Sequence, residues 1–267
     1  LHLSLRRQRQ MCIRDSVSGG EAIPVVAKVR DGRPIKLEGN TLSSYTRGGT
    51  SARVQAAVLD LYDTARLRNP MMRSGDNRTA IAVDVADKAI MEALPQGPVV
   101  LLTSTITSPS TRSIIAEFLS KYPGSRHVQY DAASYSALLL ANEATYGRKA
   151  IPSYQFDQAK TIVSLGADFL GTWLSPVAFA RQYAAGRKVD QNNPDISKHI
   201  QFESMISLTG ANADERYTHS PSAAGTVAAA LLAAVQGQEV TGVDGNLKKG
   251  VLSAAKSLLA SKGKALV

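Results

Sequence analysis

The second half of the chain repeats one pattern, in which a short apolar run is followed by a polar turn and then by a stretch with the apolar period of an α-helix. Short, mostly apolar runs of this kind are typical of parallel strands that helices cover on both faces. Short connections place successive strands beside one another in one sheet. The pattern predicts strands at residues 99–102, 127–130, 161–165 and 200–208, and helices at residues 112–122, 132–145, 176–186 and after Pro221.

These units predict the fold class α/β: a β-rich N-terminal segment (residues 17–75) followed by a doubly wound, mostly parallel Rossmann-like sheet (residues 76–245). Residues 246–267 are predicted to start a further α/β unit, with a helix capped by Asn246 and then the opening of a strand. A buried strand of three residues would leave backbone groups unpaired. We therefore expect the sheet to be truncated at the C-terminus, and the chain to be a fragment cut at both ends.

The β-rich segment has clear turn and cap signals. The pair Asp31 and Gly32 is typical of a tight turn between strands at residues 23–29 and 34–38. Ser51 is a suitable N-cap for a helix whose apolar positions start at Val54.

Residues 1–16 differ from the rest of the chain. They contain four arginines, one acidic residue and the only cysteine, without either a helical or a strand period. Residues 10–16, QMCIRDS, resemble translated sequencing-adapter sequence. This resemblance predicts that residues 1–16 are a non-native or disordered arm that packs against nothing. The alternative is a genuine basic arm.

Composition excludes several classes of protein. With 44% hydrophobic residues the chain is not disordered. Its longest apolar run, residues 223–235, is too short for a membrane span. The net charge of +9 comes from scattered lysines and arginines without interleaved aromatics, so no nucleic-acid partner is expected. The single cysteine, Cys12, cannot by itself hold zinc or an iron–sulfur cluster.

Self-sufficient catalytic motifs are absent from the sequence: there is no phosphate loop, no G-x-G-x-x-G after a strand, no H-E-x-x-H and no G-x-S-x-G. His127, His199 and His219 each stand alone, which favours partly exposed histidines over metal ligands or triad members. No catalytic and no metal-binding residue is predicted.

Polar residues follow two predicted strands, where open α/β sheets place their ligands. They are Asp168 after the third strand and Asn212, Asp214 and Glu215 after the fourth. Turn chemistry alone also accounts for such residues. Trp173, the only tryptophan, lies in the first of these loops and is expected either to contact a ligand or neighbouring domain, or to pack in the core.

Several segments resemble the molybdopterin oxidoreductases. Residues 32–40 and 47–50 are similar to the early β-rich region of that family, and residues 61–70 carry its Y-D-x-x-R-x-x-x-P stretch. Residues 161–170 are similar to the strand and glycine turn beside the pterin. Within the family, residues 55–63 and 199–221 look most like the large iron–sulfur subunits of alternative complex III, the bacterial periplasmic quinol:electron-acceptor oxidoreductases.

The chain also departs from the family pattern. Residues 50–53 stand where active members carry a cysteine ligand of an iron–sulfur cluster, and hydroxyl or methyl groups cannot replace a thiolate on iron. The resemblance implies a subunit whose molybdopterin-like domain has no molybdenum cofactor. It also implies that the iron–sulfur clusters lie in a C-terminal domain outside these residues, so no cofactor is expected here.

The resemblance therefore implies a cofactor-free scaffold in a respiratory complex. Its expected partners are cytochrome c and integral-membrane subunits, and its expected location is the periplasmic side of the inner membrane. The alternative is the N-terminal part of an active molybdopterin-dependent oxidoreductase. A free-standing nucleotide-binding module is disfavoured by the missing glycine fingerprint.

Descent from a pterin-binding ancestor would leave a relic cleft beyond Leu165 and Leu208. Its candidate residues are Gly166, Asp168, Trp173, Asn212 and Asp214. An empty cleft forfeits dispersion contacts along its lining, so we expect side chains to fill it, with Trp173 as the largest candidate.

Overall fold

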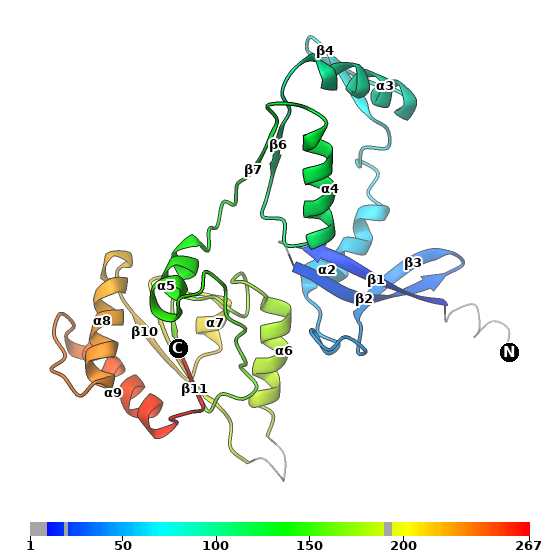
Figure 1. Ribbon diagram of the computed structural model, residues 1–267. Helices are drawn as coiled ribbons and strands as arrows, with labels where there is room; N and C mark the ends of the chain where they lie inside the picture. The colour runs from blue at the N-terminus through cyan, green and yellow to red at the C-terminus, as the bar shows by residue number, and fades with distance from the viewer. Residues whose placement is uncertain (1–9, 19–20, 190–193) are drawn as a thin grey trace, which may run out of the picture. The chain divides into compact units, whose positions relative to one another are not determined.

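The computed structural model describes residues 10–18, 21–189 and 194–267 (Figure 1). Its contacts divide the chain into two compact units. Among the described residues, the first unit combines residues 10–16, 23–55, 152–189 and 194–267, and the second combines residues 17–18, 21–22 and 56–151. The predicted single sheet over residues 76–245 is therefore divided, because its early strands belong to the second unit and its later strands to the first.

The first unit contains a four-stranded parallel sheet in the order β10-β9-β8-β11. Its strands are β8 (Thr161–Leu165), β9 (Lys198–Glu203), β10 (Glu215–Thr218) and β11 (Ala265–Leu266). The helices that follow the strands are α6 (Pro176–Gly186), α7 (Leu208–Ala211), α8 (Ala224–Val235) and α9 (Gly245–Ala260), with the short turn η3 (Pro221–Ala223) before α8. This confirms the predicted α/β class with a parallel sheet.

The strand order fixes where the connections change direction. Along the chain the sheet grows from β8 to β9 to β10, and the chain then returns to place β11 on the other side of β8. The topological switch point therefore lies between β8 and β11. Residues 246–267 contain the predicted helix and strand, α9 and β11, and β11 pairs with β8 of this sheet.

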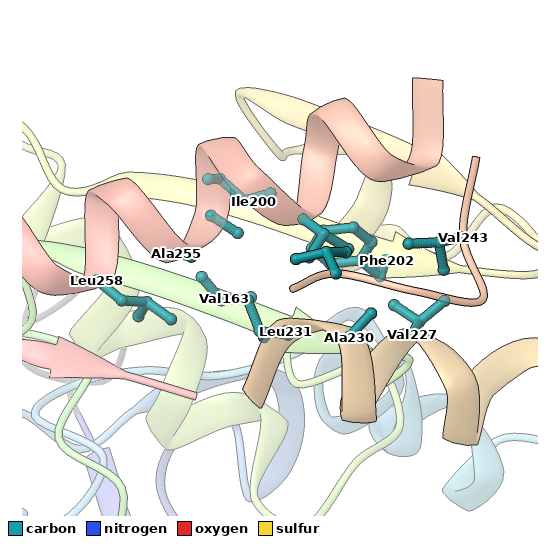
Figure 2. Close-up of a cluster of buried hydrophobic side chains, with 12 residues drawn as sticks. Val163, Ile200, Phe202, Val227, Ala230, Leu231, Val243, Ala255 and Leu258 are labelled. Atoms are coloured by element: carbon teal, nitrogen blue, oxygen red, sulfur yellow. The ribbon is translucent and has the colours of Figure 1, made fainter. Parts of the chain in front are cut away.

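Apolar clusters cover both faces of this sheet. Figure 2 shows side chains of β8 and β9 packed with those of α8 and α9, among them Val163 and Phe202. A second cluster joins Ile162 of β8 to α6 through aromatic residues. Its buried members are Phe156, Ala159, Ile162, Phe169, Phe179 and Tyr183. Helices on both faces confirm the doubly wound arrangement.

The β-rich segment forms a three-stranded sheet, β1-β2-β3. Its strands are β1 (Gln10–Ser18), β2 (Glu21–Arg30) and β3 (Arg33–Gly39). Asp31 and Gly32 have φ values of 48° and 79°, as the predicted tight turn requires. The Ser51 hydroxyl accepts from the Val54 amide at the start of α2 (Ala52–Ala56), which runs into the 3-10 turn η1 (Ala57–Leu61).

The prediction that residues 1–16 pack against nothing is wrong for residues 10–16, which belong to β1 beside β2. A strand can form there without an apolar period because ladder hydrogen bonds come from the backbone. Residues 1–9 lie outside the described residues, and the foreign origin of the arm stays a prediction.

The second unit has two small sheets. β4 (Met71–Ser74) and β5 (Asn77–Ala80) form an antiparallel hairpin, and β6 (Val100–Thr103) and β7 (Arg126–Gln129) a parallel pair. The helices are α3 (Val83–Ala93), which continues into η2 (Leu94–Gln96), α4 (Pro109–Ser120) and α5 (Ser136–Tyr146). From residue 59 to residue 151 no residue is buried.

Among the residues that the structure describes, no helix is both long and apolar enough to cross a membrane.

Candidate functional site

A row of buried polar side chains runs along β9 in the first unit. The strand reads His-Ile-Gln-Phe-Glu from residue 199, so its side chains alternate between two faces. Ile200 and Phe202 face the apolar cluster of α8 and α9. His199, Gln201 and Glu203 share the other face and are 0%, 0% and 3% exposed. Buried polar groups need hydrogen-bond partners, and here they partner one another.

Three contacts connect the row from the start of β9 to its end. His199 Nδ1 lies 3.1 Å from the Tyr183 hydroxyl of α6. His199 Nε2 lies 3.3 Å from Gln201 Oε1, and Gln201 Nε2 donates to Glu203 Oε2 at 3.2 Å. The row therefore connects the imidazole of His199, near the amino end of β9, to the carboxylate of Glu203 at its carboxyl end.

The Glu203 carboxylate is fully engaged with its own chain. Arg216 Nε of β10 donates to Glu203 Oε1, and the Ser207 hydroxyl donates to Oε2 at 2.6 Å. A Cβ atom on Gly210 would lie 1.9 Å from Glu203 Oε1, so the residue at 210 must be glycine for the carboxylate to fit. Burial raises the pKa of Glu203, but the hydrogen bonds from Ser207 and Arg216 outweigh it and hold the pKa below its usual range.

His199 has the opposite environment. Burial, only partly offset by the hydrogen bond with Gln201, lowers the pKa of its imidazole, which favours the neutral ring. The Phe169 ring packs against it with a centroid distance of 5.4 Å. The predicted partly exposed histidine is therefore wrong at position 199, because the polar face of β9 is covered by α6 and not by water.

Asp214 lies at the amino end of β9, beside His199. Its carboxylate accepts from the His199 amide (2.8 Å) and forms two hydrogen bonds with Arg187 (2.6 and 2.8 Å). Burial raises the pKa of Asp214, but the hydrogen bonds from Arg187 and from the His199 amide together outweigh burial, so the pKa is lowered. Asp214 thus ties α6 to the strand pair β9–β10.

Asp168 closes the opposite, carboxyl edge of the sheet. Its Oδ1 accepts from both the amide (3.1 Å) and the hydroxyl (2.9 Å) of Thr209, and its Oδ2 accepts from the Thr172 hydroxyl (3.1 Å). A Cβ atom on Gly171 would lie 2.2 Å from that Oδ2. Gly166, which directly follows β8, has a φ of 75° and donates its amide to the Phe202 oxygen at 2.8 Å.

Trp173 is half-buried and packs in the aromatic cluster on the α6 side. Its ring centroid lies 5.1 Å from that of Tyr154 and 6.1 Å from that of Phe179. The side chain therefore supports the loop after β8 from within the unit.

The five candidates for a relic cleft do not form one site. Gly166, Asp168 and Trp173 follow the carboxyl end of β8, whereas Asp214 contacts the first residues of β9 at the opposite edge. Asn212 takes part through its main-chain oxygen, which accepts from the Tyr183 hydroxyl at 2.9 Å. The difference arises because β9 ends at Glu203, five residues before the predicted end, and α7 then leads the chain back to the amino edge.

The remaining polar candidates have structural partners. Glu215 forms an ion pair with Lys198 at 2.6 Å. His127 bonds to the Thr103 hydroxyl at 2.8 Å, and His219 to the Ser220 main-chain oxygen at 2.8 Å. Both of these histidines are partly exposed, as predicted.

Gln201, Glu203, Tyr183 and Arg216 were not predicted from the sequence. The signal for the first two is the strict alternation of polar and apolar residues in the strand at 199–203, since a central strand of a doubly wound sheet has no solvent face. The described part of the chain has no group of three or more His, Cys, Asp or Glu residues that could hold a metal ion.

No protein-family model matches the chain. The chain is similar to the menaquinone reductase, molybdopterin-binding-like subunit, of Nitratidesulfovibrio vulgaris, with 22% identity over 205 residues. That similarity covers 72% of this chain and 28% of the relative, so the chain spans less than a third of the relative's length.

Among solved structures, acetylene hydratase from Pelobacter acetylenicus has a similar fold, with a TM-score of 0.61 and 16% sequence identity. The match covers 95% of this chain and 40% of that chain. At this level of identity the similarity is evidence for a shared fold alone. The shared fold extends over almost the whole of this chain.

Proposed function

We propose that this chain is a scaffold within a molybdopterin-oxidoreductase-like subunit of a respiratory quinol:electron-acceptor oxidoreductase of the alternative complex III type. The similarity to the molybdopterin-binding-like subunit of a menaquinone reductase supports a role in quinone-linked electron transfer. In this role the chain supplies geometry to its complex and does not itself carry electrons.

The observation that carries the proposal is the closed carboxyl edge of the sheet. Open α/β proteins bind ligands beyond the carboxyl ends of their strands. Here the carboxylates in that position, Asp168 and Glu203, accept hydrogen bonds from Thr209, Thr172, Ser207 and Arg216 of the same chain. Side chains engaged in this way hold the loops after β8 and β9 together, which suits a structural role.

The residues present do not fit an iron–sulfur cluster. Iron–sulfur clusters use cysteine thiolates as ligands, and the only cysteine of the 267 residues is Cys12, in β1. Thr50 and Ser51 occupy the stretch where the family resemblance implies a cluster ligand, and the Ser51 hydroxyl caps α2 instead. No redox step is therefore assigned to these residues.

The partners follow from the same proposal. A scaffold of this kind would contact a cytochrome c subunit and integral-membrane subunits at the periplasmic side of the bacterial inner membrane. The iron–sulfur clusters would lie in another part of the same subunit. The similar protein of Nitratidesulfovibrio vulgaris is named as a subunit, which supports the proposal that this chain also belongs to a complex.

The test is affinity purification of the tagged protein from detergent-solubilised membranes of the organism that encodes it. We expect haem-containing and membrane-embedded subunits to co-purify, together with quinol-dependent reduction of an electron acceptor. An untagged strain is the control. Recovery of the protein alone, with neither haem nor membrane subunits, would contradict the proposal.

The second candidate function is an active molybdopterin-dependent oxidoreductase. The similarity to a subunit described as molybdopterin-binding-like favours it. The two candidates differ in metal content, since an active enzyme would hold its metal and substrate at the edge of the sheet that Asp168 and Glu203 close here.

A further inference from the structure

When His199 is neutral, the hydrogen-bonded row along β9 contains one more acceptor atom than it has hydrogens to donate. An ionised Glu203 only accepts, so the amide nitrogen of Gln201 faces it and Gln201 Oε1 faces the imidazole. His199 Nε2 must then carry a hydrogen, which it donates across the 3.3 Å contact to Gln201. In a neutral ring this leaves Nδ1 without hydrogen, as an acceptor.

The Tyr183 hydroxyl has to serve two acceptors at that point. It lies 3.1 Å from His199 Nδ1 and 2.9 Å from the main-chain oxygen of Asn212. A phenol carries a single hydrogen. When His199 gains a proton, Nδ1 becomes a donor to the Tyr183 oxygen, and the hydroxyl hydrogen is then available to Asn212 alone.

We propose that Tyr183 is a two-position donor that couples the protonation of His199 to the main chain at the end of α7. Asn212 is the C-cap residue of α7, and Thr209 of the same helix holds the Asp168 carboxylate. The added proton stays on His199, and the redirected hydroxyl of Tyr183 strengthens the hydrogen bond at Asn212, in the segment that contacts the carboxyl end of β9. This inference is independent of the proposed function.

The charges around His199 permit such a change. From α6 it faces Tyr183 and Arg187, from the residue before β10 it faces Asp214, and along its own strand it faces Glu203, which is paired with Arg216 of β10. Arg187 and Asp214 form a close ion pair and largely offset each other. Burial lowers the pKa of His199, so the neutral ring is the resting state. Burial raises the pKa of Tyr183, so its hydroxyl keeps its hydrogen in both states.

The test is a pH titration by NMR of the full 267-residue chain with labelled histidine nitrogens and a labelled Asn212 carbonyl. At about pH 7.5 burial keeps the His199 ring neutral by lowering its pKa, and we expect the Nε2–H tautomer with Nδ1 as acceptor. On acidification the Asn212 carbonyl should shift with the same midpoint as the His199 nitrogens. His2→Gln, His127→Gln and His219→Gln identify the signals of the other three histidines, so the remaining signal belongs to His199.

Two matched tyrosine variants isolate the hydroxyl. In Tyr183→Phe the charged imidazole loses an acceptor, so the His199 midpoint should move to lower pH and the Asn212 shift should vanish. Tyr217→Phe removes a hydroxyl that donates to Glu215 and should leave both observations unchanged. If Tyr183→Phe fails to fold, two measurements on the wild-type chain still test the inference: the tautomer of His199, and whether His199 and the Asn212 carbonyl titrate with the same midpoint.

Three results would each overturn the inference. The first is an Nδ1–H tautomer of His199 at neutral pH. The second is an Asn212 response that persists in Tyr183→Phe. The third is a His199 ring that does not titrate before the chain unfolds in acid.

Discussion

At the scale of single residues, the contact between Glu203 and Gly210 shows how one missing side chain makes room for a buried charge. A methyl group at position 210 would lie 1.9 Å from the Glu203 carboxylate, so either α7 or the end of β9 would have to shift. Because Glu203 is also held by Ser207 and Arg216, it has little freedom to move. The close approach therefore links the end of β9 to α7.

Gly210→Ala should destabilise the chain by about 1–3 kcal/mol, the usual cost of overpacking a tight site. Gly225→Ala is the matched control, because no atom lies within 4 Å of a Cβ at position 225 of α8. In a helix that change should be neutral or stabilise by about 0.5–1 kcal/mol. Urea unfolding measures both variants, and equal effects would contradict the role given to the contact.

Glu203 should also make stability depend on pH. Its pKa is lowered in the folded chain, so its contribution is complete above the ordinary value of 4.5 and is lost as the pH falls through the lowered pKa. Glu203→Gln should cost about 2 kcal/mol at neutral pH, since it leaves Arg216 without its carboxylate, and should flatten the loss of stability below the ordinary glutamate value.

The control is Glu239→Gln, at an exposed position. It should alter neither the stability at neutral pH nor its decline in acid by more than about 0.5 kcal/mol. Urea unfolding at a series of pH values gives both curves. A wild-type acid decline that Glu203→Gln leaves intact would rule out Glu203 as its source.

At the scale of elements, the accuracy of the sequence predictions follows from what ends each element. Residues 161–165 and 176–186 were predicted with the bounds that the structure has, because a glycine turn and a proline at the first helical position mark them. β9 was predicted too long, because the Ser207 cap of α7 reads as continued strand. The burial of His199 was missed because the polar residues of a strand look alike whether water or a helix covers them.

The helix α6 and the loop after β8 depend on Trp173. Trp173→Ala should destabilise the first unit by about 3 kcal/mol, the lower end of the range for a large aromatic residue, because the side chain is only half-buried. Trp173→Phe should cost less than half as much, since a smaller ring keeps part of the contact with Tyr154. Thermal or urea unfolding measures both. A loss below about 1 kcal/mol in the alanine variant would make Trp173 a surface residue instead.

At the scale of the whole molecule, the two units differ in how much they bury. In the first unit, the residues that the structure describes form three clusters of buried apolar side chains. The second has no buried residue from 59 to 151, and apolar side chains such as Met91 and Leu102 are more than 60% exposed. The sequence did not separate the two parts, because a short apolar run reads the same in a two-stranded and in a four-stranded sheet.

Hydrogen exchange should reflect this difference. Amides of β8 and β9 should exchange at rates set by global unfolding, whereas those of β6 and β7 should exchange orders of magnitude faster, because few buried contacts hold that pair. Peptide-level exchange measured by mass spectrometry compares the two pairs in one sample. Equal protection of both pairs would contradict the division.

The central claim is that these residues form a scaffold whose sheet edge is closed by its own side chains. Metal analysis of the purified 267-residue chain, produced with iron and molybdenum in the medium, tests it most directly. We expect that neither metal reaches a stoichiometric level, and that any trace of iron disappears in Cys12→Ser, which removes the one thiolate ligand. Iron or molybdenum at close to one atom per chain, unchanged in Cys12→Ser, would contradict it.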